Sequence, residues 1–127
     1  MATFDVNNVQ TLTFGNGELV IPDASLYEAS SDHWREEEHH ASLANTRSQV
    51  AAWRGEPGWV RITDWPYHEI CVIQKGRVAI EDQTGGRREF GPGEAFVVPA
   101  GFNGVWHTLE ASEKIFIGIQ PDSPASA

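Results

Sequence analysis

The stretch GPGEAFVVPAGFNGVWH, residues 91–107, decides the fold class, because it places a short apolar run between two turn signals. Gly91-Pro92-Gly93 and Pro99-Ala100-Gly101 favour tight turns, since glycine adopts positive φ readily and proline fixes φ. The run between them, Ala95–Val98, has the length of one short strand. Proline at position 99 also ends a strand without leaving a backbone donor unpaired. We therefore expect strand, turn and strand here.

The same alternation of short apolar runs and turn residues continues through the chain from Thr46 onward. Gly- or Pro-containing turns separate most of these runs, and their spacing is typical of an antiparallel sandwich or barrel. The predicted strands are Ser48–Arg54, Trp59–Trp65, Glu69–Gln74, Arg77–Glu81, Arg87–Phe90, Ala95–Val98, Gly104–Leu109 and Lys114–Ile119.

The first 45 residues differ in composition from the rest. One or two short strands are expected before Pro22, and the acidic, His-rich stretch that follows favours a short helix around 34–38, capped by Ser31 or Asp32. We predict one domain, with an N-terminal arm at 1–45, a barrel at 46–120 and a frayed tail at 121–127.

Composition excludes several partners. The formal net charge is −9, from 9 Lys plus Arg against 18 Asp plus Glu, and that field repels nucleic acid and anionic membrane surfaces. No apolar run reaches the roughly 18 residues of a membrane span. The N-terminus MATFDVNNVQ lacks the features of a signal peptide, so a cytoplasmic location is expected. The single cysteine, Cys71, is expected to be a small buried hydrophobe.

Two motifs resemble those of the cupins, which are small jelly-roll β-barrels. HEICVIQKG, residues 68–76, is similar to the end of the first cupin motif, and GPGEAFVVPAG, residues 91–101, is similar to the start of the second. FNGVW, residues 102–106, further resembles the single-domain cupins related to ureidoglycine aminohydrolase and to ethanolamine utilisation. The resemblance covers about Ala52–Ile119 and implies an all-β antiparallel barrel.

The resemblance also implies where a metal would bind. A cupin metal site takes two histidines and a glutamate from the first motif and one histidine from the second, a donor set that suits transition metals. Only the glutamate, Glu69, is present here, and the three histidine positions fall on Thr63, Trp65 and Gly104. We therefore predict no metal and no other cofactor at the motif positions.

Histidines outside the motifs could still supply metal ligands. If Glu69 points into the barrel, strand alternation directs His68 outward, and the matching alternation in the second motif directs His107 outward as well. Both are expected on the surface or at an interface. They could bind a metal together only if their strands were adjacent.

The segment DHWREEEHHASL is the other candidate for metal binding. On a helix, His33, Glu36, Glu37 and His40 would share one face, which we expect to be a solvated acidic surface. If the segment instead covers the mouth of the barrel, His39 or His40 could join the glutamate of the first motif at a metal.

Strand alternation predicts an inner wall that combines aromatic rings with a few polar groups. A carboxylate among rings loses hydration, so we expect a raised pKa at Glu69, which suits a general acid or base. The same carboxyl could instead pair with Arg61 or accept from Tyr67. Tryptophan faces beside a carboxylate also suit an amine-bearing ligand. The predicted ligand-binding residues are Arg61, Thr63, Trp65, Tyr67, Trp106 and Thr108.

Three functions are compatible with these residues. The first is metal-free binding of a small polar or amine-bearing molecule. The second is a hydrolase, isomerase or lyase acting on a small metabolite, with Glu69 as acid or base or with a metal held by non-motif histidines. The third is a scaffold whose barrel is filled by its own tryptophans. In each case we predict a homodimer, because the N-terminal strands could extend a partner's sheet and cover its edge.

Overall fold

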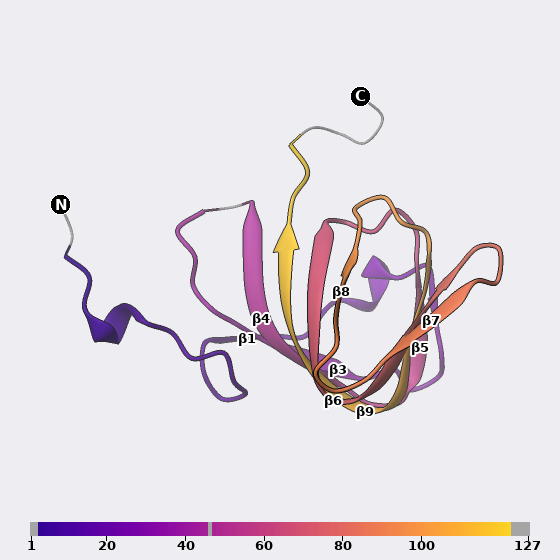
Figure 1. The fold of residues 1–127 in the computed structure, drawn as a ribbon, viewed down its shortest axis with the longest axis horizontal. Helices are drawn as coiled ribbons and strands as arrows, with labels where there is room; N and C mark the ends of the chain where they lie inside the picture. Colours follow the sequence, from indigo (N-terminus) through magenta and orange to yellow (C-terminus); the bar gives the residue numbers. More distant parts are fainter. Residues whose placement is uncertain (1–2, 46, 123–127) are drawn as a thin grey trace.

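The computed structural model describes residues 3–45 and 47–122, whose strands form one antiparallel sheet curled into a barrel (Figure 1). The sheet follows the order β1-β3-β4-β9-β5-β2, and β6 pairs with β7, β8 and β9. The all-β jelly-roll prediction is confirmed. The strands are β1 (Glu18–Val20), β2 (Ala29–Ser30), β3 (Glu36–His40), β4 (Ser48–Gly55), β5 (Gly58–Ile62), β6 (His68–Asp82), β7 (Arg87–Phe90), β8 (Ala95–Val98) and β9 (Gly104–Ile119).

Two long strands, β6 and β9, connect the two halves of the barrel. The sequence predicts two shorter strands in place of each, and in β6 the predicted break is at Lys75-Gly76, which resembles a turn signal. In the structure Gly76 has φ 84° and lies where the β6–β9 register shifts, and a Cβ there would lie 2.2 Å from Ser112 Oγ. The glycine therefore kinks one continuous strand and does not end it.

The acidic segment forms a strand, so the helix expected around 34–38 is wrong. β3 pairs antiparallel with β4 on one side and with β1 on the other. Pairing and inward hydrogen bonds outweigh the helix propensity of the glutamates. The helical excursion before the barrel consists of two 3-10 turns, η1 (Val6–Asn8) and η2 (Ala24–Leu26). β1, β2 and β3 all join the sheet, so the segment before residue 46 contributes strands to the barrel.

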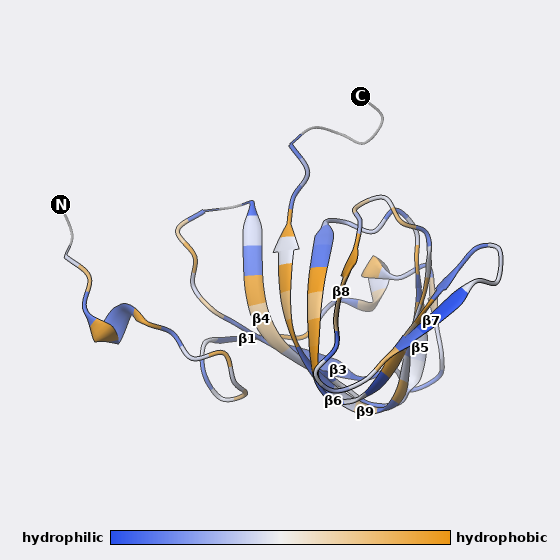
Figure 2. Ribbon diagram, viewed as in Figure 1, coloured by the Kyte–Doolittle hydropathy of each residue, from blue (hydrophilic) through white to orange (hydrophobic). Residues whose placement is uncertain are grey.

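The core fills the inside of the curl and is mostly aromatic and aliphatic. Hydrophobic residues recur along β4, β6 and β9, whereas the hairpin of β6 and β7 is strongly hydrophilic (Figure 2). None of the described helices is long and apolar enough to cross a membrane. The most buried hydrophobic core residues are Ala51, Ala52, Cys71, Ile73, Val78, Ala79 and Phe116. The predicted tail, from residue 123 onward, lies outside the described residues.

Candidate functional site

A cavity of about 420 Å³ lies within the barrel, and its size suits a small molecule. Strand register brings its key side chains together. Glu38, Trp53, Lys114 and Ile73 are successive partners in one row across β3, β4, β9 and β6. Residues that oppose one another on adjacent strands project from the same face of a sheet. This row therefore presents a carboxyl group, an indole ring and an ammonium group to the barrel interior.

A buried ion pair joins the ammonium of this row to the glutamate of the first motif. Lys114 Nζ lies 2.7 Å from Glu69 Oε2, and the two residues are 5% and 6% exposed. Trp65 Nε1–H donates to Glu69 Oε1 at 2.9 Å, and the Cys71 thiol donates to Oε2 at 3.2 Å. The carboxylate thus accepts three hydrogen bonds, which compensates for the loss of its hydration.

Three aromatic rings surround the ammonium group of Lys114. Its Nζ lies 3.8 Å from the ring centroid of Trp106, 4.7 Å from that of Trp53 and 5.3 Å from that of Phe116. Such faces attract a cation through the ring quadrupole. The sequence predicts that tryptophan faces in the barrel bind the amine of a ligand. In the structure the ammonium of Lys114 occupies that position.

Charge attraction outweighs burial at this pair. Burial would raise the pKa of Glu69, but Lys114 and the hydrogen-bond donors lower it below its usual range. Burial would lower the pKa of Lys114, yet the charge and the hydrogen bond of Glu69 raise it above its usual range. The raised pKa that the sequence predicts for Glu69 is wrong, because sequence reasoning missed Lys114. Both groups stay charged at neutral pH, while burial raises the pKa of the Cys71 thiol and keeps it neutral.

A glutamate–histidine pair, Glu38 and His40, lies on β3, in the acidic segment for which the sequence predicts a helix. Glu38 Oε1 is 2.7 Å from His40 Nε2, and both side chains line the cavity. Burial raises the pKa of Glu38, and the hydrogen bond and charge of His40 oppose that rise only in part. Glu38 therefore faces the cavity with a raised pKa and does not belong to the ion pair of Lys114 and Glu69.

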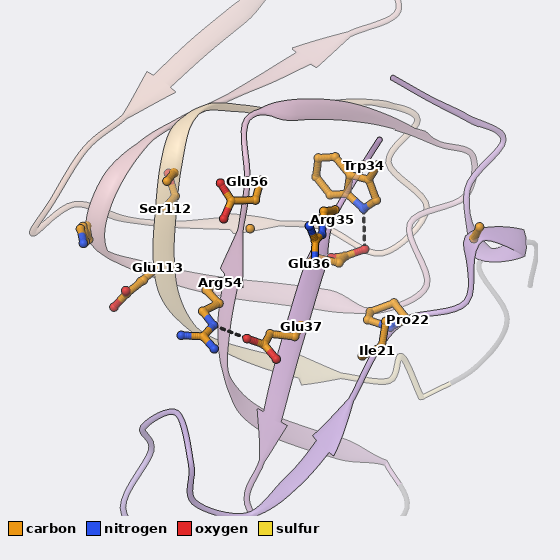
Figure 3. A pocket seen from close by; sticks show the side chains of 14 residues that line it. Ile21, Pro22, Trp34, Arg35, Glu36, Glu37, Arg54, Glu56, Ser112 and Glu113 are labelled. Carbon is orange, nitrogen blue, oxygen red and sulfur yellow. Dashed lines mark hydrogen bonds and ion pairs between the residues drawn. The ribbon is translucent and has the colours of Figure 1, made fainter. Parts of the chain in front are cut away.

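Glu36 closes one wall of the cavity, and both of its carboxyl oxygens accept hydrogen bonds from other side chains of the chain. Trp53 Nε1–H donates to its Oε1 at 2.7 Å, while Trp34 Nε1–H donates to its Oε2 at 2.8 Å. The Tyr27 hydroxyl also donates to Oε2. Beyond this wall an open hollow of about 630 Å³ lies on the outside of the barrel, where Arg54 pairs with Glu37 (Figure 3).

The structure brings most of the predicted ligand-binding residues together. Trp65, Tyr67 and Trp106 line the cavity beside Glu69, and Thr63 lies at its edge, where it hydrogen-bonds Glu28.

Two of the predicted residues lie elsewhere. Thr108 is buried but accepts a hydrogen bond from Trp106 Nε1, at 3.0 Å. Arg61 is exposed and packs over the Trp59 ring, so its assignment to the cavity is wrong. The strand β5 ends at Ile62, and the loop that follows breaks the alternation counted back from Glu69.

The remaining histidines lie away from the cavity. His68 accepts a hydrogen bond from Ala100 N at 3.1 Å, and His107 bonds Glu81 at 2.8 Å. His68 pairs with Ile119 at one end of β6, whereas His107 pairs eleven residues further along that strand, so the two do not meet. His33 is exposed in a loop, and His39 packs against Phe14 on the outer face of β3.

The donor set at the cupin metal position does not fit a transition metal. The indole of Trp65 binds Glu69, whose oxygens are also engaged by Lys114. Gly104 leaves no room for a side chain, because a Cβ there would lie 2.2 Å from Glu81 O. Across residues 3–45 and 47–122, no three His, Cys, Asp or Glu side chains group closely enough to hold a metal.

Solved structures share the fold at low sequence identity. The EutQ protein of Clostridium difficile superposes with a TM-score of 0.69 at 13% identity, covering 94% of this chain and 93% of that one. A putative ethanolamine utilization protein Q from Salmonella typhimurium gives 0.63 at 11%, covering 84% and 98%. A protein of unknown function from Rhizobium leguminosarum gives 0.59 at 13%, covering 95% and 98%.

None of the curated proteins matches this chain in sequence. The model of the EutQ-like cupin domain matches residues 43–116, which is more than half of the chain and includes β4 to β8 and most of β9. The chain therefore belongs to the family of EutQ-like cupin domains.

Proposed function

We propose that the barrel binds a small polar molecule without a metal. The observation that carries this proposal is the cavity of about 420 Å³, whose aromatic wall includes the Glu38–His40 pair among its polar groups. A concave, mostly apolar site with a few convergent polar groups is the usual form of a small-molecule site.

The hydrogen bonds inside the barrel support Glu38 as the residue that binds the ligand. Glu36 is engaged by three donors, and Glu69 is engaged by Lys114, Trp65 and Cys71. Glu38 is bonded through Oε1 only, so its second oxygen can accept from a ligand. A barrel filled by its own tryptophans is less well supported, because a cavity of this size remains beside them.

The test is a calorimetric titration of the full chain with glycerol, propanamide, propylamine and propanoate. We expect saturable binding of at least one compound with one site per chain. Glu38→Gln should weaken that binding, whereas Glu37→Gln, on the same strand but facing outward, should not. Absence of binding by all four compounds, or an equal effect of the two variants, would contradict the proposal.

A second candidate function is acid–base catalysis at the same cavity. The raised pKa of Glu38 and its contact with His40 favour this role for Glu38, because a carboxyl with a raised pKa donates or accepts a proton near neutral pH. Glu69, held ionised by Lys114, suits an anchoring role. Turnover of a bound compound that is abolished in Glu38→Gln while binding persists would support catalysis; binding without turnover would leave the protein a binder.

We also propose that the chain forms a homodimer. The N-terminal arm carries Phe4, Val6 and Val9, each more than three quarters exposed, and large apolar side chains in such an arm favour burial against another surface. Sedimentation equilibrium should give twice the mass of the chain. A monomer at tens of micromolar would contradict this proposal.

A further inference from the structure

The ammonium group of Lys114 has fewer partners than a buried ammonium needs. It carries three N–H donors. One is bonded to Glu69 Oε2 at 2.7 Å, and the nearby face of Trp106, 3.8 Å from Nζ, can receive a second. Within the described part of the chain no other nitrogen or oxygen acceptor hydrogen-bonds Nζ, and the neighbouring Cys71 thiol offers only a weakly accepting sulfur. Lys114 also lines the cavity, so one donor is available to a bound molecule.

Glu38 faces the same space from the other side of Trp53. The register places Trp53 between Glu38 and Lys114, so the two backbones are two strands, or about 10 Å, apart. Side chains of this length reach toward one another and leave a gap that a small molecule can span. The cavity thus has a donor at one end, an acceptor at the other and aromatic rings between them.

Charge limits what can occupy this gap. An anion that approaches Lys114 also meets the carboxylates of Glu36 and Glu69, which line or approach the same cavity. A cation that approaches Glu38 meets an ammonium already held by three rings. Either ion would also lose its hydration on entry. An uncharged molecule with an oriented dipole avoids both costs.

We propose that the cavity is specific for small uncharged molecules that carry an acceptor oxygen and an O–H or N–H donor a few bonds apart, such as hydroxy amides and diols. The acceptor oxygen binds the Lys114 ammonium and the donor binds the Glu38 carboxylate. This inference rests on the proposed binding function and adds the chemical class of the ligand to it.

Three probes with a hydroxyl on the same three-carbon skeleton test the charge rule: lactamide, lactate and 1-amino-2-propanol. Each is titrated into the full-length ¹⁵N-labelled protein, and the indole N–H signals of Trp53 and Trp106, which flank the gap, report binding. We expect lactamide to shift these signals saturably. Lactate and 1-amino-2-propanol should bind at least about tenfold more weakly, because each brings an uncompensated charge.

Two variants test whether Lys114 and Glu38 bind the two ends of the ligand. Lys114→Met combined with Glu69→Gln removes the ammonium without leaving a bare carboxylate, and should weaken lactamide at least about tenfold. Glu38→Ala should weaken it as well, whereas Glu37→Ala on the outer face should not. An unchanged far-ultraviolet circular dichroism spectrum verifies the fold of each variant, and Glu38→Ala carries the test if the double variant does not fold.

The outcomes separate this inference from the proposed function. If lactate or 1-amino-2-propanol binds as tightly as lactamide, the charge rule is overturned while binding at the cavity stands. The same holds if none of the three binds but propylamine or propanoate does, because both of these compounds are charged at neutral pH. If no compound of either set binds, both the inference and the proposed function are overturned.

Discussion

Replacement of Lys114 by methionine tests whether the buried ion pair is built as described. Methionine preserves much of the length of the side chain and its contact with the rings of Trp53 and Trp106, but it removes the ammonium. Glu69 would then be a carboxylate that is 6% exposed and lacks its counter-charge. A buried charge that loses its partner is strongly destabilising, by about 3–5 kcal/mol.

The surroundings of Glu69 place the expected loss at the lower end of that range. Trp65 and Cys71 still donate to the carboxylate after the substitution. We therefore expect Lys114→Met to lower the free energy of unfolding by about 3 kcal/mol. Urea denaturation at pH 8, followed by tryptophan fluorescence, measures it. A loss below about 1 kcal/mol is typical of a solvated surface pair and would refute the reasoning.

A double variant separates the lost charge from lost packing. Glu69→Gln in the Lys114→Met background removes the bare carboxylate and retains a group that can accept from Trp65. We expect it to recover most of the loss, because replacing both members of a buried pair is often close to neutral. If the double variant is as unstable as Lys114→Met, packing around the lysine stem and not the charge stabilises the fold.

The pH dependence of the single variant follows from the sign of each pKa shift. In the wild type, the pKa of Glu69 is lowered, so its contribution is present above the ordinary carboxyl pKa and is lost as pH falls through the folded value. In Lys114→Met, burial acts without the ammonium and raises the pKa of Glu69. The folded state then binds the proton more tightly, so the deficit should shrink as pH falls from 8 toward 5.

Three further predictions concern the strand contacts, the β3 pair and the thiol. Gly104→Ala should lower the free energy of unfolding by about 1–3 kcal/mol in urea, because its Cβ meets Glu81 O; an unchanged midpoint would contradict that close approach. Because the pKa of Glu38 is raised, its contribution to stability is lost as pH rises through its folded pKa. The stability of Glu38→Gln relative to wild type should therefore increase from pH 5 to pH 8. A difference in the free energy of unfolding that does not change with pH would argue against a buried carboxyl. Cys71 should react with a thiol reagent such as dithionitrobenzoate only on unfolding, and rapid reaction in the native state would contradict its burial.

The sequence predicts the barrel well because its turn chemistry is local. Arg87–Phe90 and Ala95–Val98 are predicted with the bounds the structure has, since glycine or proline lies within two residues of each end. Gly76 misleads, because a glycine that kinks a strand and one that ends it have the same local signature. The segment at 34–38 misleads for another reason: isolated glutamates favour a helix, while pairing with β4 depends on a partner distant in sequence.

The candidate site is predicted only in part, because it depends on register. Glu69, Trp65 and Trp106 are found from the motifs and from alternation. Lys114 is missed, although it shares its parity with the buried Phe116 and Gly118, and that alternation was the available signal. Glu38 is predicted to face the barrel only if the acidic segment is assumed to be a strand, in which side chains alternate between the two faces. No pattern in the sequence indicates that the two lie in one row across Trp53.

The central claim is that the resident cation of this barrel is the ammonium of Lys114, placed to meet a ligand. The most direct test is an NMR spectrum of ¹⁵N-labelled lysine ammonium groups at neutral pH, because the chain has two lysines, Lys75 and Lys114, and only Lys75 is exposed. We predict one slowly exchanging ammonium signal, which belongs to Lys114 and shifts when lactamide is added. Fast exchange of both lysines with water, or a Lys114 signal that lactamide does not change, would contradict the claim.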